Sequence, residues 1–586
     1  MKLLLHYLDR YRWQVALAFL LATINQTFSL LDPYIFGKLI DSYAKNPKAY
    51  TEPAYLKGVG LMISAIIGVA MVSRIAKTLQ DYVVNLVIQK FGASVFTDGL
   101  QHTLKLPYQQ FEDQRSGETL SILQKVRTDS EKFISSFINV AFVSIVGIVF
   151  LVIYAINVNP WLVLIYFLGS FFLAFLTKIL SKKIKEIQKV IVRETTQLAG
   201  TATESLRNIE LVKSLGLTDQ EISRLNANTQ KILQLELKKV RSVRSIGFIQ
   251  GTFVNLLRQV ILFVLLTLIF KDEMTVGQLL TLQFYSFFIF GPLQEFGNVI
   301  LAYREAEASL ENFEKLLNTP IEETPKHPTD LGKVENLRFE NITFKHASAN
   351  TPALESVNFE VKKGETVAFV GPSGSGKTTL VKLLVGLYHP EIGQVFYNQI
   401  PSNAINVEEL RSQIGFVTQD TQLFSGTIRE NLLFVNPAAT DADMLDVLQK
   451  ASCSNLLARA DNGLNSVIGE GGIKISGGEK QRLSIARALL RNPNIFVFDE
   501  ATSSLDSITE EEITDTVKAV TANGGYITVM IAHRLSTIMH ATKIFVLEKG
   551  KIVENGTHDE LLEHKGLYYA MWRQQVGEKD LVENEG

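Results

Sequence analysis

Residues 366–378 read TVAFVGPSGSGKT, a short apolar run that ends in a glycine-rich loop, and a helical pattern, TLVKLLVGLY, follows over 379–388. A loop of this form between a strand and a helix is the Walker A motif. Its glycines let backbone N–H groups close around phosphates, and the helix N-terminus adds its positive end. We therefore expect ATP to be bound by Gly371, Pro372, Ser373, Gly374, Ser375, Gly376, Lys377, Thr378 and Thr379. Lys377 is expected to reach the β and γ phosphate oxygens during catalysis, and Thr378 to offer its hydroxyl to Mg²⁺.

A second motif, IFVFDE over 495–500, is an apolar strand that ends in two carboxylates. Such a pair alone is more often a helix cap or a solvated turn. Together with a Walker A loop it is typical of Walker B, in which Asp499 would hold magnesium. Glu500 is then placed to orient or deprotonate the water that attacks the γ-phosphorus.

A third motif, ISGGEKQR over 475–482, directly precedes another helical pattern. Ser476, Gly477 and Gly478 would form a second helix N-terminus that attracts phosphate. One nucleotide needs two such cradles, so far apart in sequence, only when they come from different subunits. The motif therefore indicates a dimer.

Apolar residues make up 46% of the 586 residues, and their long runs lie before residue 305. A helix needs about 20 apolar residues to cross a bilayer. Six spans fit, at about 14–35, 58–80, 138–158, 161–180, 246–270 and 279–300. A large soluble helical protein is the alternative, but runs such as 144–153 and 260–270 have no polar face to turn toward water.

Lys and Arg, which gather in cytoplasmic loops, follow the second and fourth spans. We therefore expect an integral membrane protein, in a bacterial inner membrane, with its N-terminus and everything after residue 305 in the cytoplasm. Three lysines in the 41–57 link oppose this orientation but are outnumbered. The expected domains are a transmembrane domain over 1–305, a linker over 306–334, an α/β nucleotide-binding domain over 335–575 and an acidic tail over 576–586.

Composition excludes other classes. The formal net charge of −2 gives no basic face for nucleic acid, so no nucleic-acid partner is expected. The single cysteine, Cys453, allows neither an intrachain disulfide nor a thiolate metal cluster and is interpreted as a core residue. The N-terminal MKLLLHYLDRYRW has no small-residue cleavage site and is expected to be retained.

The SGG motif about twenty residues before Walker B resembles the signature of ATP-binding cassette proteins. The whole chain is similar to an exporter half-transporter of that family. The resemblance implies a six-helix, domain-swapped membrane bundle fused to a cytoplasmic P-loop ATPase. It implies ATP and Mg²⁺ as cofactors and a second copy of the chain as partner, with membrane lipid and a small amphiphilic cargo as further partners.

The resemblance assigns further residues. Gln419 looks like the Q-loop glutamine that touches magnesium, Ser504-Leu505-Asp506 like the D-loop that reaches the opposite subunit, and His533 like the switch histidine at the γ-phosphate. Glu470 resembles an exporter-type loop, and segments 106–123 and 204–216 resemble the two intracellular loops that dock on the cassettes. The family usually stacks a tyrosine on adenine about 25 residues before Walker A. This chain has His346 there, which stacks with less surface.

These features predict ATP-driven export of an amphiphile by alternating access, with the cargo (lipid, drug-like compound, peptide or glycolipid) left open. A soluble cassette ATPase would lack the spans, a gated channel would be expected to lose Glu500 in one site, and an importer would carry its membrane domain on another chain. Arg258 lies near the middle of the fifth span and is expected to face the bundle interior. It would be neutralised there by Glu295 or a backbone carbonyl, or else contact an anionic group of the cargo.

Overall fold

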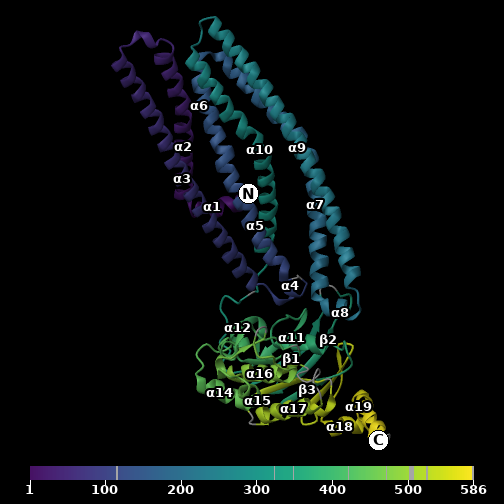
Figure 1. The fold of residues 1–586 in the computed structure, drawn as a ribbon. Helices are drawn as coiled ribbons and strands as arrows, with labels where there is room; N and C mark the ends of the chain where they lie inside the picture. The colour runs from purple at the N-terminus through teal and green to yellow at the C-terminus, as the bar shows by residue number, and fades with distance from the viewer. Residues whose placement is uncertain are drawn as a thin grey trace. The chain divides into compact units, whose positions relative to one another are not determined.

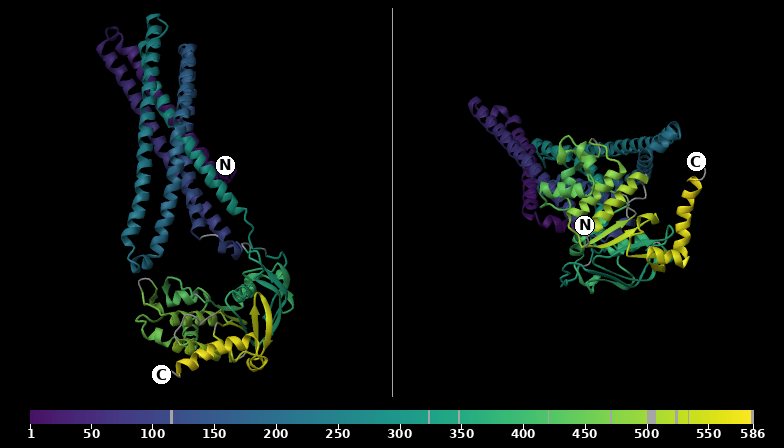
Figure 2. Two further views of the ribbon diagram at one scale, coloured as in Figure 1. Left: turned by 90° about the vertical axis from the view of Figure 1, so that its right-hand side faces the viewer. Right: turned by 90° about the horizontal axis from the view of Figure 1, so that it is seen from below.

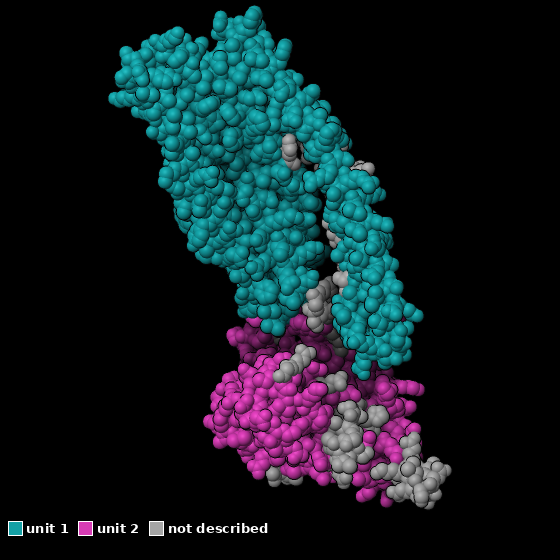
Figure 3. Space-filling model, in the orientation of Figure 1, with its two compact units in different colours: residues 1–104, 115–319 teal, residues 105–114, 320–586 magenta. Residues whose placement is uncertain are grey.

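The computed structural model describes the chain in nine ranges, 1–113, 116–322, 324–346, 349–419, 421–469, 472–499, 507–522, 525–532 and 534–583. The chain forms two compact units (Figure 3). The membrane unit holds Met1–Leu104 and Arg115–Thr319, and the cassette unit holds Lys105–Gln114 and Pro320–Gly586. The expected linker 306–334 is therefore divided, because residues 306–317 belong to the last membrane-unit helix and residues 320–334 to the cassette unit.

The described part of the membrane unit contains helices joined by short turns and has no strand (Figure 1). Its elements are α1 (Lys2–Asp9), α2 (Arg12–Leu39), η1 (Ile40–Ala44), η2 (Pro47–Ala49), α3 (Glu52–Leu104), α5 (Ser116–Ser136), η3 (Phe137–Phe142), α6 (Val143–Val158), α7 (Pro160–Arg207), α8 (Ile209–Ser214), α9 (Thr218–Phe270) and α10 (Val276–Leu317). The short helix α4 (Tyr108–Asp113) belongs to the cassette unit.

Among the described residues, five helical stretches are long and apolar enough to cross a membrane. They are Arg12–Ala44, Glu52–Leu104, Thr119–Val158, Thr218–Phe270 and Val276–Leu317, and a shorter apolar stretch, Pro160–Leu173, begins α7. Each of the six expected spans lies on one of these stretches or, for the fourth, begins on the shorter one. The helices are much longer than the spans, and α7 and α9 run side by side in both directions of view (Figures 1 and 2).

Side-chain caps fix where the membrane helices begin. The Asn159 side chain accepts a hydrogen bond from the backbone N–H of Trp161 at 3.0 Å, and Pro160 occupies the first helical position of α7. Thr275 and Gln278 form a capping box at the start of α10. These caps satisfy N–H groups that a helix leaves without partners in its first turn.

Helices α2 and α10 are in close backbone contact at Gly37 and Gly277. A Cβ atom on either glycine would overlap the backbone of the other, so only glycine permits this contact. Above and below it, α10 side chains bond to α2. Thr281 donates to the carbonyl of Pro33 at 3.1 Å, Tyr285 donates to the carbonyl of Leu30 at 2.8 Å, and Asp41 accepts from the Gly277 N–H at 2.8 Å. The contact is therefore both close-packed and hydrogen-bonded.

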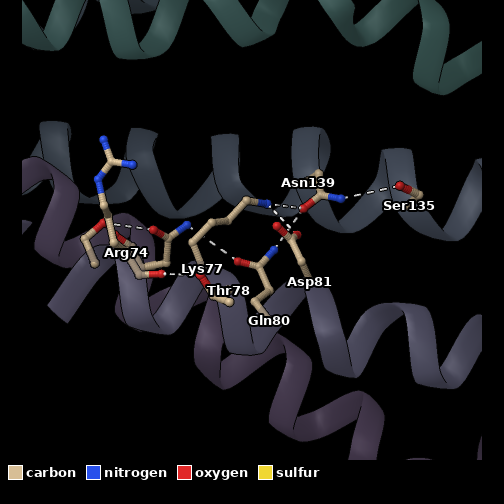
Figure 4. Close-up of polar contacts among 9 residues, drawn as sticks. Arg74, Lys77, Thr78, Gln80, Asp81, Ser135 and Asn139 are labelled. Atoms are coloured by element: carbon tan, nitrogen blue, oxygen red, sulfur yellow. Dashed lines mark hydrogen bonds and ion pairs between the residues drawn. The ribbon is translucent and has the colours of Figure 1, made fainter. Parts of the chain in front are cut away.

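A polar cluster joins α2, α3 and η3 (Figure 4). Lys77 donates to Asp81 and to Asn139, both at 2.8 Å, and Gln80 donates to the same Asn139 oxygen at 2.9 Å. The Asn25 amide of α2 completes the cluster at 3.5 Å from Gln80, which is fully buried. Because buried polar groups are costly without partners, mutual hydrogen bonding is what lets these residues sit between helices.

The described strands of the cassette unit form a four-stranded sheet in the order β2-β1-β4-β5, a six-stranded sheet in the order β12-β11-β3-β10-β9-β6, and a small pair β7-β8. The strands are β1 (Asn336–Phe344), β2 (Leu354–Lys362), β3 (Thr366–Val370), β4 (Ile392–Tyr397), β5 (Ile400–Pro401), β6 (Ile414–Val417), β7 (Gly426–Thr427), β8 (Val467–Ile468), β9 (Ile495–Asp499), β10 (Ile527–Ile531), β11 (Lys543–Glu548) and β12 (Lys551–Gly556). The helices are α11 (Lys377–Leu384), η4 (Ser402–Ala404), α12 (Val407–Ser412), α13 (Ile428–Leu433), α14 (Asp441–Lys450), α15 (Ser454–Ala458), η5 (Gly463–Asn465), α16 (Gly477–Leu490), α17 (Ser507–Ala522), η6 (Leu535–Thr537), α18 (His558–His564) and α19 (Leu567–Glu583).

Two hydrophobic clusters build the core of the cassette unit. One contains residues of β1, β2 and α11 and includes Leu331 and Val334, and the other contains residues of α14, α16 and α17 and includes Cys453. Cys453 is 2% exposed, so it lies in the core as expected, and burial raises the pKa of its thiol to about 12.

The stretch just before β1 is tied to the same unit. Arg411 of α12 forms a two-pronged ion pair with Glu322, with N–O distances of 2.8 and 3.0 Å, and donates to the carbonyl of Gly386 at 2.7 Å. The backbone N–H of Glu322 donates to the carbonyl of Lys105 at 2.8 Å. One carboxylate residue thus fastens both segments that connect to the membrane unit.

Candidate functional site

The parallel strands of the six-stranded sheet bring the expected nucleotide motifs to one edge. Phe369 of β3 lies opposite Ile531 of β10, which lies opposite Asp499 of β9, and Val417 of β6 lies opposite Phe498. The Walker A loop, Asp499 and Gln419 therefore all follow the carboxyl ends of adjacent or nearby strands. Ligands of open α/β sheets bind at this edge.

The Walker A loop is shaped by glycines that no other residue could replace without strain. Gly371, Gly374 and Gly376 have φ values of 152°, 78° and 105°. A Cβ on Gly371 would also overlap the carbonyl of Leu547, and one on Gly376 would lie 2.5 Å from the carbonyl of Ala353. Close approach of neighbouring backbone and positive φ together make the loop a pre-formed cradle.

Polar side chains of the loop converge on its interior. Lys377 is 6% exposed, and its Nζ donates to the carbonyls of Gly371 and Pro372 at 2.9 and 3.1 Å. Ser375 is 3% exposed, and its Oγ has no hydrogen-bond partner among the described residues. A buried hydroxyl of this kind is costly unless a ligand oxygen accepts from it, so Ser375 fits a phosphate.

Asp499 is the carboxylate best placed for a metal. It is 6% exposed at the end of β9, whereas Gln419 is exposed. No group of three or more His, Cys, Asp or Glu residues that could hold a metal occurs in the described ranges. A single buried carboxylate near a phosphate-binding loop fits Mg²⁺, which keeps several waters and is held by one or two carboxylates together with substrate phosphates. Asp499 and the exposed Thr378 hydroxyl would supply the protein ligands, with Gln419 beside them.

The signature motif begins α16 as a helix N-terminus. Ser476 is the N-cap, its Oγ accepts from the N–H of Glu479 at 3.2 Å, and the Glu479 carboxylate accepts from the N–H of Ser476 at 2.9 Å. Burial tends to raise the pKa of Glu479, but the hydrogen bonds from Ser476 and the ion pair with Arg459 lower it overall. The capping bond uses an acceptor lone pair of Ser476 and leaves its hydroxyl proton available for a phosphate oxygen.

Several expected site residues lie outside the described residues. They are Glu470, Glu500, the D-loop with Ser504, Leu505 and Asp506, and His533. Their assignments stay predictions.

His346, the expected adenine platform, lies beside the Walker A helix. Its Nε2 is 3.3 Å from the Oγ1 of Thr379, so two residues expected to bind the nucleotide contact each other. The imidazole meets the rings of Phe344 and Tyr388 edge-on, with centroids 5.1 and 5.6 Å apart. Phe344 and Tyr388 in turn stack at 4.8 Å with an interplanar angle of 10°. The aromatic group holds His346 in place.

Two residues whose contacts could not be predicted from the sequence, Lys382 and Tyr108, extend this aromatic group. Lys382 of α11 lies over the rings of Tyr108 and Tyr388, with its Nζ 5.3 and 5.2 Å from their centres, and bonds to the Tyr388 hydroxyl at 3.2 Å. Tyr108 is in the first expected intracellular loop. This loop segment is thus held by the same helix that begins with the Walker A lysine. The sequence does not predict this contact, because a lysine in a helix and a tyrosine just after it are both common without any such contact.

In the membrane unit, Arg258 of α9 lies against α10. Its Cζ is 3.8 Å from the centre of the Phe287 ring, and its Nε has no hydrogen-bond partner in the described part of the chain. The ion pair with Glu295 that was expected as one alternative does not form among the described residues, because Glu295 instead accepts from Asn298 at 2.5 Å. An aromatic face, not a carboxylate, packs against the guanidinium.

Both parts of the chain match families of known proteins. Residues 354–503 match the ABC transporter family, and residues 15–293 match the ABC transporter transmembrane region. The chain is 29% identical over 574 residues to the ATM1-type heavy metal exporter of Novosphingobium aromaticivorans, covering 97% of this chain and 93% of that protein. It is 30% identical over 535 residues to an uncharacterized ABC transporter ATP-binding protein of Bacillus subtilis, covering 89% and 91%.

A solved structure of a bacterial Atm1-family ABC exporter with ATP bound has a TM-score of 0.85 and 28% identity, covering 96% of this chain and 98% of that one. Together with the fused helical and P-loop units, these matches confirm the expected fold and ATPase class. The chain belongs to the ABC transporter family, as an integral membrane half-transporter of the exporter type whose ATPase is coupled to translocation.

Proposed function

We propose that two copies of the chain form a homodimer that binds two ATP with Mg²⁺ and exports an amphiphile by alternating access. The observation that carries the proposal is the pair of phosphate-seeking helix N-termini in one cassette. The Walker A helix α11 belongs to one hydrophobic cluster and the signature helix α16 to the other. Each nucleotide would be bound by the Walker A loop of one subunit and by Ser476, Gly477 and Gly478 of its partner.

The proposed reaction is attack of water on the γ-phosphorus, with the bond to the β-phosphate oxygen breaking. Glu500 would accept the proton of this water, and Lys377 and His533 would stabilise charge on the γ-phosphate oxygens. Bound Mg²⁺ would neutralise charge on the β and γ phosphates, held by Thr378 and Asp499 with Gln419 beside it. Asp506 would reach the opposite subunit. Binding of ATP would close the cassettes, and hydrolysis would reset them.

We favour a homodimer over a heterodimer because Glu500 and the SGG signature are both intact in this chain. Heterodimeric relatives would be expected to carry one damaged copy of each. The chain expressed alone should purify as a dimer with ATPase activity, measured by native mass and phosphate release. An inactive monomer that a second gene product restores would refute the homodimer.

The Lys and Arg distribution supports an orientation with the cassette and the N-terminus in the cytoplasm, and the bacterial relatives support an inner membrane as the location. A cysteine placed in the 271–275 link should then react with a membrane-impermeant thiol reagent in intact cells, while one placed in segment 209–214 should react only after lysis. The opposite pattern would reverse the orientation.

The proposed cargo carries an anionic group next to an apolar body. Arg258 lies near the middle of an apolar helix, its flat guanidinium faces the Phe287 ring, and Asn255 and Gln259 are exposed on the same helix. A guanidinium that has no carboxylate partner among the described residues, yet stays charged, is suited to a cargo phosphate or carboxylate.

Arg258→Gln tests the cargo proposal in lipid nanodiscs with a panel of anionic, neutral and cationic amphiphiles. It should abolish most stimulation of ATPase activity by anionic amphiphiles and spare basal activity and folded yield. Arg241→Gln, an exposed arginine four to five turns earlier on α9, is the matched control and should keep stimulation. Loss of basal and stimulated activity alike would make Arg258 structural, and unchanged stimulation would remove it from cargo recognition.

A further inference from the structure

A cavity of about 450 Å³ lies between the ends of three membrane helices, far along the chain from the nucleotide motifs. Its walls come from the last turns of α2 with Asp41, the last turns of α6, and the N-cap and first turns of α10. None of the expected cargo or nucleotide residues lines it.

The walls are held in a fixed arrangement. The Gly37–Gly277 contact closes one side, where no side chain fits. In the cavity wall, Tyr34 and Tyr154 contact each other edge-on with ring centroids 5.8 Å apart, and Tyr154 packs edge-on against Tyr285 at 5.4 Å. Because helix contacts, rather than a loop, set its shape, the cavity is pre-formed for a ligand.

The cavity wall contains two charged side chains, Asp41 and Lys38. Both oxygens of Asp41 already accept hydrogen bonds, one from the Gly277 N–H at 2.8 Å and one from the Thr275 hydroxyl at 2.5 Å. Lys38 is exposed, forms no ion pair among the described residues, and holds its Nζ 4.8 Å from the centre of the Tyr34 ring. Asp41 is thus held by α10, and Lys38 is the cation in the wall that can meet an anionic group of a ligand.

The rest of the lining is largely apolar. Phe150, Ile153 and Val158 line the α6 side, next to the tyrosine rings. One cation at the rim of an apolar, aromatic wall matches a molecule with a negative head and a hydrocarbon body.

The position of the cavity along the membrane helices indicates that such a molecule would come from the lipid bilayer. Lys38 is one residue from the end of α2 at Leu39, and Val158 and Val276 are the terminal residues of α6 and α10. Helix ends flanked by Asn159 and the charged link Lys271, Asp272 and Glu273 mark the membrane–water interface, where tyrosines and lysines contact lipid headgroups.

We propose that this cavity is a binding site for one anionic phospholipid of the leaflet at this end of the helices. The phosphate lies at Lys38, and an acyl chain lies along Ile153 and the Tyr34 and Tyr154 rings. The site does not depend on the nature of the cargo or on ATP hydrolysis. It makes lipid composition of that leaflet a determinant of how firmly α2, α6 and α10 stay together.

Native mass spectrometry of the full-length protein tests the proposal with phosphatidylglycerol and phosphatidylcholine of identical chains. Wild-type protein should retain phosphatidylglycerol more tightly. Lys38→Gln should weaken that affinity about fivefold, the equivalent of about 1 kcal/mol for one lysine at a charged lipid surface. Lys48→Gln, at the same end but outside the cavity, should keep the wild-type affinity. Equal affinities for the two lipids, or equal effects of the two substitutions, would overturn the proposal.

A free anion is distinguished from a lipid by competition, and wild-type protein keeps the test valid if Lys38→Gln fails to fold. Glycerol phosphate at lipid-equivalent concentration should not displace phosphatidylglycerol, and displacement would overturn the lipid assignment. A phosphatidylglycerol analogue with a photoreactive chain should label residues 31–41, 150–158 or 275–281 of the wild-type protein. Labelling confined to other segments would also overturn it.

Discussion

Replacing Lys382 by methionine should loosen the loop segment 105–113 from the cassette. Lys382 lies over two rings, those of Tyr108 and Tyr388, and bonds to the Tyr388 hydroxyl at 3.2 Å. Each cation–ring contact at a partly exposed position contributes about 0.5–1 kcal/mol. Only the contact with Tyr108 holds the loop directly, and loss of the support from Tyr388 brings the expected cost to about 1–2 kcal/mol.

Amide hydrogen exchange of peptides covering 105–113 measures this cost in the full-length protein. A loss of 1–2 kcal/mol corresponds to about 5–30-fold faster exchange through local opening. Methionine keeps the length and apolar stem of lysine, so packing along α11 should persist.

Arg338→Met is the matched control. Arg338 lies over the Phe396 ring at 4.6 Å and pairs with Glu340 in the same unit, and among the described residues it has no ion pair or ring contact with the loop, so its removal should leave exchange of 105–113 unchanged. In a double-mutant cycle, Tyr108→Leu and Lys382→Met should be less than additive. Full additivity, or equal acceleration by Arg338→Met, would refute the cation–ring contact as the fastening.

Glu500→Gln should bind ATP but hydrolyse it at least about a hundredfold more slowly, because the general base is lost, and near-normal phosphate release would remove Glu500 from the mechanism. His346→Ala should weaken ATP affinity by threefold to tenfold, as expected for an aromatic contact of about 0.5–1.5 kcal/mol, while His346→Tyr should retain it. Equal affinity in a nucleotide-binding assay of His346→Ala and wild type would contradict the platform role. Gly277→Ala should lower the midpoint of thermal unfolding, because its methyl group would overlap the Gly37 carbonyl, whereas Gly251→Ala, where a Cβ meets no neighbour within 4 Å, should not.

The sequence predicted the features that follow from periodicity and motif spacing. Long apolar runs located the membrane helices, but residues 306–317, which were expected to belong to a linker, continue α10 to Leu317. The Walker A loop, Asp499 and the SGG helix lie where strand–loop–helix patterns placed them, because local glycine and capping chemistry determines those structures. The sequence also correctly placed Cys453 in the core.

Contacts between distant segments could not be predicted in this way. The Tyr108–Lys382 contact joins residues 274 positions apart along the chain, and each residue is unremarkable in its own helix. Glu295, expected as one possible partner of Arg258, forms no ion pair with it among the described residues. The positions of these residues in the sequence do not show which faces of α9 and α10 meet. The cavity beside Lys38 likewise arises from three helices and has no one-dimensional signal.

The ion pair between Arg411 and Glu322 has a consequence for how the cassette should be cut out as a separate protein. A fragment that starts at residue 335, just before β1, would omit Glu322 and the buried side chains of Leu331 and Val334. Arg411, about one-fifth exposed, would then lose its bidentate partner and keep only Glu408, at the longer distance of 3.3 Å, as a carboxylate contact, at a cost of about 1–3 kcal/mol. An expression fragment that begins at Pro320 keeps these contacts. It still leaves out the segment that starts at Lys105, whose carbonyl accepts a hydrogen bond from the Glu322 N–H.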